Sequence, residues 1–529
     1  MREFAAELLV DRLVDWGVDT VFGLPGEHDT GVAAALAARA EKIRLIRVRH
    51  EEAAAFMATG YAKATGRPGV CLATSGPGAV HLLNGLYDAK LDHQPVLAVT
   101  ELEESRLLGT AFHADIHLDR LFEDVADYNV RVNVPVQIPA VVDIALGHAA
   151  TKGAVSHITF PPGLDKGDET DYWVARTPAT APATAPVFLP SPGVPPPAEL
   201  RRAAAALNQG SRRAMLVGVG AQGARSELLA VAERLASPIM KSLPGKATVP
   251  DDHPLSTGCI GAFGTRPAED ALAGADALLV VGTNFPWTAH LPDPGKVRTV
   301  QIETDLARVG APTPTEVPLV GDAAETLQAL LPLLDRAEDR SFLDRAQQGM
   351  AEWRERLAAL EDADRTPVVP RYLARVVDRL AAADAILASD SGESATWSAH
   401  HFEVRAGRHY LLSANLSTMA AGLPYAIAAQ WAHPGRQVIA FVAADGFAQL
   451  MAELLTAVSH RLPVKVVVAN PAEPTEGPAP DFARWAQSCG WLGFHVEQPE
   501  ALPEVIRAAF AHPGPALVDV LVGPDDPVG

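Results

Sequence analysis

Two adjacent acids, Glu51 and Glu52, are the first residues in the chain whose type and placement could do chemistry. They lie in the run RVRHEEAAAFMATGYAKATGRPGV, which predicts a helix that opens directly after a strand. Carboxyl groups at such a place can serve as proton donors or acceptors. Acids are also favoured at a helix start by the helix dipole alone. For an isolated pair, both interpretations stay open.

A glycine-rich turn follows the two acids. The segment GVCLATSGPGAVHLLNGLYDAKLDHQPVLAVT predicts a strand, a Gly-Pro-Gly turn, a helix and a second strand. Glycines at a strand-to-helix turn let a ligand approach the backbone, and a helix N-terminus favours an anion. SGPG alone is a weak signal of a binding site.

The elements that must position these residues repeat along nearly the whole chain. Short Val-, Ile- and Leu-rich runs alternate with longer helical patterns, which indicates parallel sheets covered on both faces. The predicted fold class is therefore α/β, with doubly wound parallel sheets. A Pro/Ala/Thr stretch at 175–197 predicts a linker, and the charged segment 335–366 predicts a surface helix between domains. Domains are expected at 1–170, 190–335 and 365–529.

The composition excludes several classes of function. A net charge of −20, from 44 Lys and Arg against 64 Asp and Glu, argues against nucleic acid as a partner. No apolar run approaches the length of a membrane span. Cys71, Cys259 and Cys489 give neither a disulfide framework nor metal-ligand spacing. The amphipathic, acid-bearing start does not read as a signal peptide, so a cytoplasmic location is expected.

The motifs VFGLPGE, RHEE and TSGPG, taken together, resemble the pyrimidine-binding domain of the thiamine diphosphate enzymes of the pyruvate oxidase and acetolactate synthase family. The resemblance runs through about the first 130 residues. It implies that Glu51 hydrogen-bonds the aminopyrimidine ring of the cofactor, whose imino nitrogen then takes the thiazolium proton. It also implies cofactor contacts at Gly26, Thr74 and Gly78, with Glu52 a solvated neighbour.

The segment LGTAFHADIHLDRLF matches the family only in part. Phe112 stands where the family has a Phe near the flavin and the reaction centre. His113 and His117 depart from the family pattern. The resemblance makes Phe112 and His113 candidate catalytic residues, and surface histidines are the competing interpretation.

The middle of the chain begins with a strand, a glycine turn and a helix in SRRAMLVGVGAQGARSELLAVAERL. A lone GxGxxG is weak evidence for a dinucleotide. The later runs GAFGTRPAEDAL, ADALLVVGTNFPW, VQIETDLARVG and VPLVGDAAETL make the whole resemble the FAD-binding domain of the pyruvate oxidase branch. FAD is therefore expected, with a scaffold that holds no flavin as the alternative. The positions that the resemblance assigns to FAD are Gly218, Gly220, Gly223, Gly264, Thr265, Arg266, Asn284, Phe285, Glu303, Asp305 and Asp322.

The last third of the chain resembles the family's diphosphate-binding domain, through ILASDSGESATWSAHHF, LLSANLSTMAAGLPYAIAAQ and MAELLTAVSHRLPVKVVVAN. Met419 falls where the family places a large apolar residue that props the cofactor in its bent shape. A core methionine is the equal alternative.

The metal anchor of the family is not matched. The family signature is Gly-Asp-Gly after a strand and Asn-Asn after the next helix and strand, and Mg²⁺ needs oxygen ligands from both. Here the ungapped alignment places Ala444 and Pro471 at the ligand positions. A one-residue slip would offer Asp445 but would not restore the second ligand. We therefore predict no metal ligand in this chain and expect thiamine diphosphate less firmly than FAD.

Three functions follow from this mixture. The first is an enzyme that decarboxylates a 2-oxo acid such as pyruvate and passes the two-carbon unit to an acceptor or its electrons to FAD. The second is a flavoprotein that has lost thiamine diphosphate and magnesium. The third is a non-catalytic subunit of a hetero-oligomer with a paralogue, because the family builds each site from two chains. A homodimer or homotetramer is otherwise expected.

Overall fold

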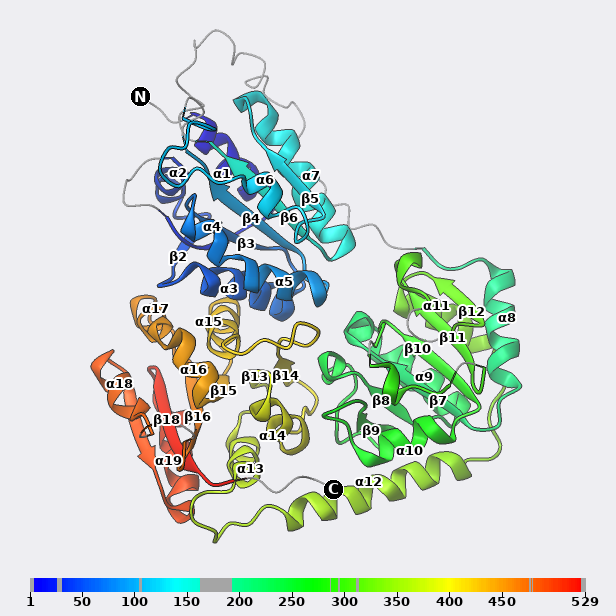
Figure 1. The fold of residues 1–529 in the computed structure, drawn as a ribbon. Coiled ribbons are helices and arrows are strands. Elements are labelled where there is room, and N and C mark those ends of the chain that lie inside the picture. The colour runs from blue at the N-terminus through cyan, green and yellow to red at the C-terminus, as the bar shows by residue number, and fades with distance from the viewer. Residues whose placement is uncertain are drawn as a thin grey trace.

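A computed structural model describes the arrangement of the chain as three six-stranded sheets with flanking helices (Figure 1). Every strand pair in the three sheets is parallel, so the predicted α/β class is confirmed. Gly26 and nearly all of the expected linker 175–197 lie outside the described residues. The residues that the structure describes are 4–25, 31–103, 107–161, 193–285, 287–293, 295–310, 314–474, 477 and 479–524.

The N-terminal sheet has the order β2-β1-β3-β4-β6-β5. Its central strands are continuous apolar runs because helices cover both of their faces. Its strands are β1 (Thr20–Leu24), β2 (Arg44–Arg47), β3 (Gly69–Ala73), β4 (Val96–Glu101), β5 (Tyr128–Arg131) and β6 (Val155–Phe160). Its helices are α1 (Phe4–Asp15), α2 (Val32–Ala38), α3 (Glu51–Thr65), α4 (Pro77–His81), α5 (Leu83–Leu91), α6 (Leu118–Leu121), η1 (Pro135–Gln137) and α7 (Ile138–Lys152).

The central sheet, read from β9, has the order β9-β8-β7-β10-β11-β12. The chain direction across the sheet reverses between β7 and β10, as in dinucleotide-binding sheets, where ligands bind beside that reversal. Its strands are β7 (Arg213–Val217), β8 (Ile239–Lys241), β9 (Ser256–Cys259), β10 (Ala277–Val281), β11 (Arg298–Glu303) and β12 (Val317–Val320). Its helices are α8 (Pro197–Asn208), η4 (Val219–Ala224), α9 (Arg225–Leu235), η5 (Leu243–Gly245), α10 (Arg266–Gly274), η6 (Thr288–His290), η7 (Leu306–Arg308), α11 (Ala323–Leu330) and η8 (Leu331–Leu333).

The C-terminal sheet has the order β14-β13-β15-β16-β18-β17. Its strands are β13 (Ile386–Ser389), β14 (His409–Leu411), β15 (Val438–Ala443), β16 (Lys465–Pro471), β17 (Leu492–Val496) and β18 (Ala516–Val522). Its helices are α13 (Pro370–Leu380), α14 (Glu393–His401), α15 (Gly422–Ala432), α16 (Ala444–Leu450), η9 (Met451–Glu453), α17 (Leu454–Ser459), α18 (Phe482–Ser488), η10 (Pro499–Ala501) and α19 (Leu502–Ala511).

The charged segment at 335–366 contains α12 (Ser341–Ala359), which runs from the central domain toward the C-terminal domain (Figure 1). One face of α12 is buried and carries Leu343, Met350, Trp353 and Leu357, while charged residues cover the remainder. The predicted surface helix is confirmed. Among the described residues, no helix is both long and apolar enough to cross a membrane.

The N-terminal and C-terminal domains meet where α3 packs against α15 (Figure 1). A Cβ added at Gly60 of α3 would lie 2.9 Å from the Cα of Tyr425 in α15, so only glycine permits this approach. The neighbouring Lys63 donates to the Tyr425 hydroxyl at 2.8 Å and to the Asp92 carboxylate at 2.7 Å. Because α3 is buried between its own sheet and α15, it is rich in alanine rather than amphipathic.

Candidate active site

Glu51 opens α3 and is largely buried, with 8% of its surface exposed. Its Oε2 lies 2.9 Å from Nδ1 of His81. A Cβ added at Gly78 would lie 3.1 Å from the Glu51 Oε1 and 2.7 Å from the Thr74 Oγ1. The structure therefore brings together Glu51, Thr74 and Gly78, which the sequence predicted to share a site, and adds an imidazole to them.

The histidines beside Glu51 were missed by sequence reasoning. His50 is the N-cap of α3, and its Nδ1 accepts the backbone N–H of Glu52. The His50 and His81 rings stack with centroids 4.4 Å apart and an interplanar angle of 26°. Their spacing in the sequence matches no motif, although a histidine directly before paired acids was a usable signal. A carboxylate backed by imidazole can hold a proton and transfer it to a bound group.

Glu52 turns away from Glu51 toward the C-terminal domain. Its Oε1 accepts a hydrogen bond of 2.6 Å from the Asn84 Nδ2, which lies 3.3 Å from the Thr418 Oγ1. The Glu52 side chain is 24% exposed. The sequence predicted a solvated neighbour, whereas the Glu52 side chain is only partly exposed and accepts a hydrogen bond from Asn84.

Glu453 of the C-terminal domain is a second buried carboxylate near the start of α3, and sequence reasoning missed it. Its Oε1 accepts the backbone N–H groups of Arg49 and His50. Burial raises the pKa of Glu453 to about 7 against these hydrogen bonds. No local pattern marks this residue, because its partners lie some 400 positions earlier in the chain.

The other predicted residues near the reaction centre are exposed in the single chain. Phe112 is 45% exposed and His113 lies beside it on the same loop, which approaches the Gly-Pro-Gly turn through Ala114 at Gly76. Met419 is 47% exposed, so it is not a core methionine. Their roles toward a cofactor stay predictions.

At the strand-order reversal of the C-terminal sheet, between β13 and β15, the side chains offer little to a cation. Ala444 is buried at the first position of α16, and Asp445 is exposed at the second. Asp390, at the end of β13, accepts the backbone N–H of Gly422 at 2.6 Å, while its Oδ2 is buried without a partner. Burial raises the pKa of Asp390 to about 7.

At the end of β16, Pro471 stands at the second anchor position, and the Oδ1 of the preceding Asn470 is buried without a hydrogen-bond partner. Asn470 is fully buried and donates to the Asp519 Oδ1 at 2.9 Å and the Pro480 carbonyl at 2.8 Å. Pro471 is exposed and has no side-chain oxygen. Magnesium requires several oxygen ligands in near-octahedral geometry, and neither Ala444 nor Pro471 supplies a side-chain oxygen.

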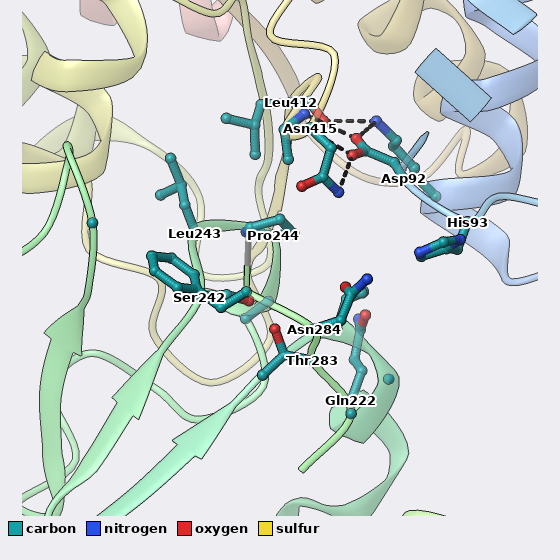
Figure 2. Close-up of a pocket in the computed structure, with 18 of the residues that line it drawn as sticks. Asp92, His93, Gln222, Ser242, Leu243, Pro244, Thr283, Asn284, Leu412 and Asn415 are labelled. Carbon is teal, nitrogen blue, oxygen red and sulfur yellow. Dashed lines mark hydrogen bonds and ion pairs between the residues drawn. The ribbon is translucent and has the colours of Figure 1, made fainter. Parts of the chain in front are cut away.

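A cavity of about 350 Å³ lies at the strand-order reversal of the central sheet, where all three domains meet (Figure 2). Such a volume is within the range of about 300 to 1,000 Å³ for small-molecule sites. Figure 2 shows Gln222, Ser242, Thr283 and Asn284 of the central domain facing side chains of the other two domains. Those facing side chains include Asp92, His93, Leu412 and Asn415.

The wall contributed by the outer domains is held by hydrogen bonds. Asp92 accepts the backbone N–H groups of Ala414 and Asn415 at 2.9 and 2.8 Å, so the loop after β14 is tied to the N-terminal domain. Burial, and secondarily the charge of Arg308, lower the pKa of His93 to about 4. His93 therefore presents a neutral imidazole to the cavity near pH 7.

Four of the predicted flavin positions line this cavity, namely Gly220, Asn284, Phe285 and Glu303. Close contact between the loops after β7 and β10 explains the glycines, because a Cβ at Gly218 would lie 2.5 Å from the Gly282 carbonyl oxygen. This cradle of backbone, polar side chains and a buried carboxylate fits a dinucleotide such as FAD.

The remaining predicted flavin positions do not line the cavity among the residues described. Three of them cap helices with their side chains: Thr265, Asp305 and Asp322. Arg266 pairs with Asp270 on the surface. The structure gives Gly223 and Gly264 no place in the cavity wall, and their part in cofactor binding stays a prediction.

Comparison with known proteins agrees with the three-sheet arrangement. Residues 4–121 match the N-terminal TPP binding domain of thiamine pyrophosphate enzymes, residues 200–330 their central domain, and residues 390–520 their C-terminal TPP binding domain. YdaP of Bacillus subtilis, whose name links it to thiamine pyrophosphate, is 35% identical over 99% of this chain and 92% of its own length. Pyruvate oxidase of Lactiplantibacillus plantarum is 31% identical (99% and 89% coverage), and a probable acetolactate synthase large subunit of Methanocaldococcus jannaschii is 30% identical (98% and 92%). The chain belongs to the thiamine pyrophosphate enzyme family.

Proposed function

We propose that this chain is a pyruvate oxidase- and acetolactate synthase-like enzyme that decarboxylates a 2-oxo acid and passes the two-carbon unit to an acceptor or its electrons to FAD. Relatives named for these two activities match it over nearly its whole length, which supports the proposal. The proposal includes a homodimer or homotetramer in the cytoplasm.

The observation that carries the proposal is the buried Glu51, which has His81 at its Oε2 and Gly78 packed so closely that an added Cβ would lie 3.1 Å from its Oε1. A carboxylate in such a place can keep a proton away from water and exchange it with a bound group. Thr74 and Gly78 belong to the same cluster, at the Gly-Pro-Gly turn that leads into α4. A solvated acid on the protein surface would not need this arrangement.

FAD is proposed for the cavity between the three domains. Asn284, Phe285 and Glu303 would hold it, and FAD when bound would supply the electron acceptor. The chain's own residues orient it and exclude water. Because Ala444 and Pro471 do not fit a magnesium anchor, the proposal assigns no reaction step to a metal-bound diphosphate.

The test begins with the purified full-length protein. We expect bound flavin in its visible spectrum and turnover of pyruvate when thiamine diphosphate is added. Calorimetric titration of thiamine diphosphate with and without Mg²⁺ then separates the alternatives. Flavin without thiamine diphosphate binding or pyruvate turnover would identify a flavoprotein of other chemistry. Binding of neither cofactor, together with co-purification of a paralogue, would identify a hetero-oligomer subunit.

A further inference from the structure

The C-terminal domain touches the N-terminal domain at the turn that leads into Glu51. Glu453, the last residue of η9, is fully buried there. Its Oε1 accepts the N–H of Arg49 at 2.9 Å and the N–H of His50 at 3.0 Å. Hydrogen bonds from backbone N–H groups to a carboxyl oxygen are among the stronger ones. One side chain of the C-terminal domain therefore holds the two residues that precede Glu51.

Glu453 is itself fixed in place. Thr456, one turn further along, donates its hydroxyl to the Oε2 of Glu453 at 2.6 Å and is fully buried. One carboxyl oxygen thus faces the N-terminal domain, and the other is held within the C-terminal domain. A side chain that is hydrogen-bonded at both carboxyl oxygens is fixed in place, and it therefore also fixes the backbone groups that it binds.

A short path of contacts runs from this anchor to Glu51. His50, whose N–H Glu453 accepts, caps α3 and stacks on the ring of His81. His81 in turn lies 2.9 Å from the Glu51 Oε2. A shift of the backbone at His50 would move the first turn of α3. It would also move the His50 ring, which stacks on His81.

We propose that Glu453 is a positioning residue that sets the orientation of Glu51 and His81 by accepting the N–H groups of Arg49 and His50. The second contact between these domains, from Thr418 through Asn84 to Glu52, holds the opposite flank of the same helix start. The inference rests on the proposed function only in taking Glu51 to be the group that does chemistry.

Hydrogen–deuterium exchange of the full-length protein tests the anchor without any assay of activity. In Glu453→Ala, amides at positions 49–52 exchange about tenfold faster than in the wild type, since two hydrogen bonds are lost. Glu453→Gln stays close to the wild type because its amide oxygen still accepts both N–H groups and its amide NH2 can donate to the Thr456 hydroxyl. Thr456→Val gives a smaller increase and carries the test if Glu453→Ala does not fold. Glu504→Ala, an exposed acid of the same domain, is the matched control and leaves exchange unchanged.

Turnover supplies the second measurement. The kcat/KM for the 2-oxo acid falls in Glu453→Ala and is rescued in Glu453→Gln. If Glu453 only stabilised the domain interface, the two variants would have the same kcat/KM under conditions in which they are equally stable. Unchanged exchange in Glu453→Ala, or equal disturbance in Glu453→Gln, would overturn the proposal. A wild type without turnover would refute the proposed function alone, because the exchange measurement still decides the role of Glu453.

Discussion

The N-terminal sheet and the C-terminal sheet have the same strand order when each is numbered from its own first strand, and both reverse direction between the first and third strands. Near that reversal the N-terminal domain presents Glu51 and Thr74, whose side-chain oxygens both lie close to Gly78. The corresponding edge of the C-terminal domain presents Ala444, a fully buried Asn470 and Pro471. One sheet design therefore carries a carboxylate–imidazole cluster in the N-terminal domain and residues without a side-chain oxygen, Ala444 and Pro471, in the C-terminal domain, which shows that the fold does not determine the site.

The buried acids of the two edges also differ in their partners. Glu51 has an imidazole at its Oε2, whereas Asp390 has a buried Oδ2 with no partner and lies against Gly446, where an added Cβ would come within 2.2 Å of it. Burial of Asp390 outweighs the hydrogen bond that it accepts from the Gly422 N–H, and it raises the pKa of Asp390 to about 7. We therefore expect that substitution of Glu51 changes catalysis and that Asp390 makes the free energy of unfolding depend on pH.

Glu51→Gln is the change expected to have the largest effect. Removing the carboxylate removes proton transfer at the N-terminal edge, so kcat/KM for a 2-oxo acid should fall by at least about a hundredfold. The melting temperature should change little. Glu52→Gln is the neighbouring control and should cost only a few-fold, because Glu52 faces Asn84. Equal losses in both variants would break the distinction between the two acids.

Asp390→Asn tests the C-terminal edge through stability. Burial raises the folded-state pKa of Asp390 from 3.8 to about 7, so between these pH values the folded state binds more protons than the unfolded state. The free energy of unfolding therefore falls as pH rises through that window, by up to about 4 kcal/mol. Glu453 contributes in the same direction, so the wild type and the variant are compared by denaturant unfolding from pH 4 to pH 8. Asp390→Asn should flatten part of the pH profile of the free energy of unfolding. An unchanged profile would show that the pKa of Asp390 is not raised in the folded state.

The double variant Ala444→Asp with Pro471→Asn sharpens the comparison by rebuilding the missing oxygen ligands. Thiamine diphosphate should then bind about tenfold more tightly in the presence of Mg²⁺ than in its absence. Ala448→Asp adds the same charge on the exposed face of α16 and should not create this dependence. Calorimetry of the three proteins measures the effect. Equally strong metal dependence in the wild type would contradict the assignment of a defective anchor.

The smallest expected effects separate two groups of predicted flavin residues in the central sheet. Asp322 accepts the N–H of Glu325 at 3.0 Å as the N-cap of α11, so Asp322→Ala should cost about 1 kcal/mol of stability and leave flavin content unchanged. Asn284→Ala, in the cavity wall, should weaken flavin binding with little change in stability. Flavin titration and thermal unfolding of both variants check this. Weaker flavin binding in Asp322→Ala with unchanged binding in Asn284→Ala would show that flavin does not bind in the cavity.

Local patterns in the chain predicted a good deal of the candidate site. The start of α3 and the Gly-Pro-Gly turn follow from the alternation of strand and helix patterns and from glycine placement, and they brought Glu51 and Gly78 together as expected. The cap residues Asp305 and Asp322 show where this reasoning is weak, because an acid at a helix start serves the helix as readily as a ligand. Motif position alone did not separate those roles.

The sequence by itself determined the order of strands and helices and the parallel sheets. It also determined that Ala444 and Pro471 have no side-chain oxygen. Each of these depends only on residue type and short-range pattern. Only the tertiary structure decided that Glu453 contacts the two residues before Glu51 and that His81 lies beside the Glu51 carboxylate. It also decided that residues of three domains line one cavity. These contacts join residues far apart in the chain, and the contact of Glu453 forms across the interface at which α3 packs against α15. No local periodicity encodes which distant surface a helix will meet.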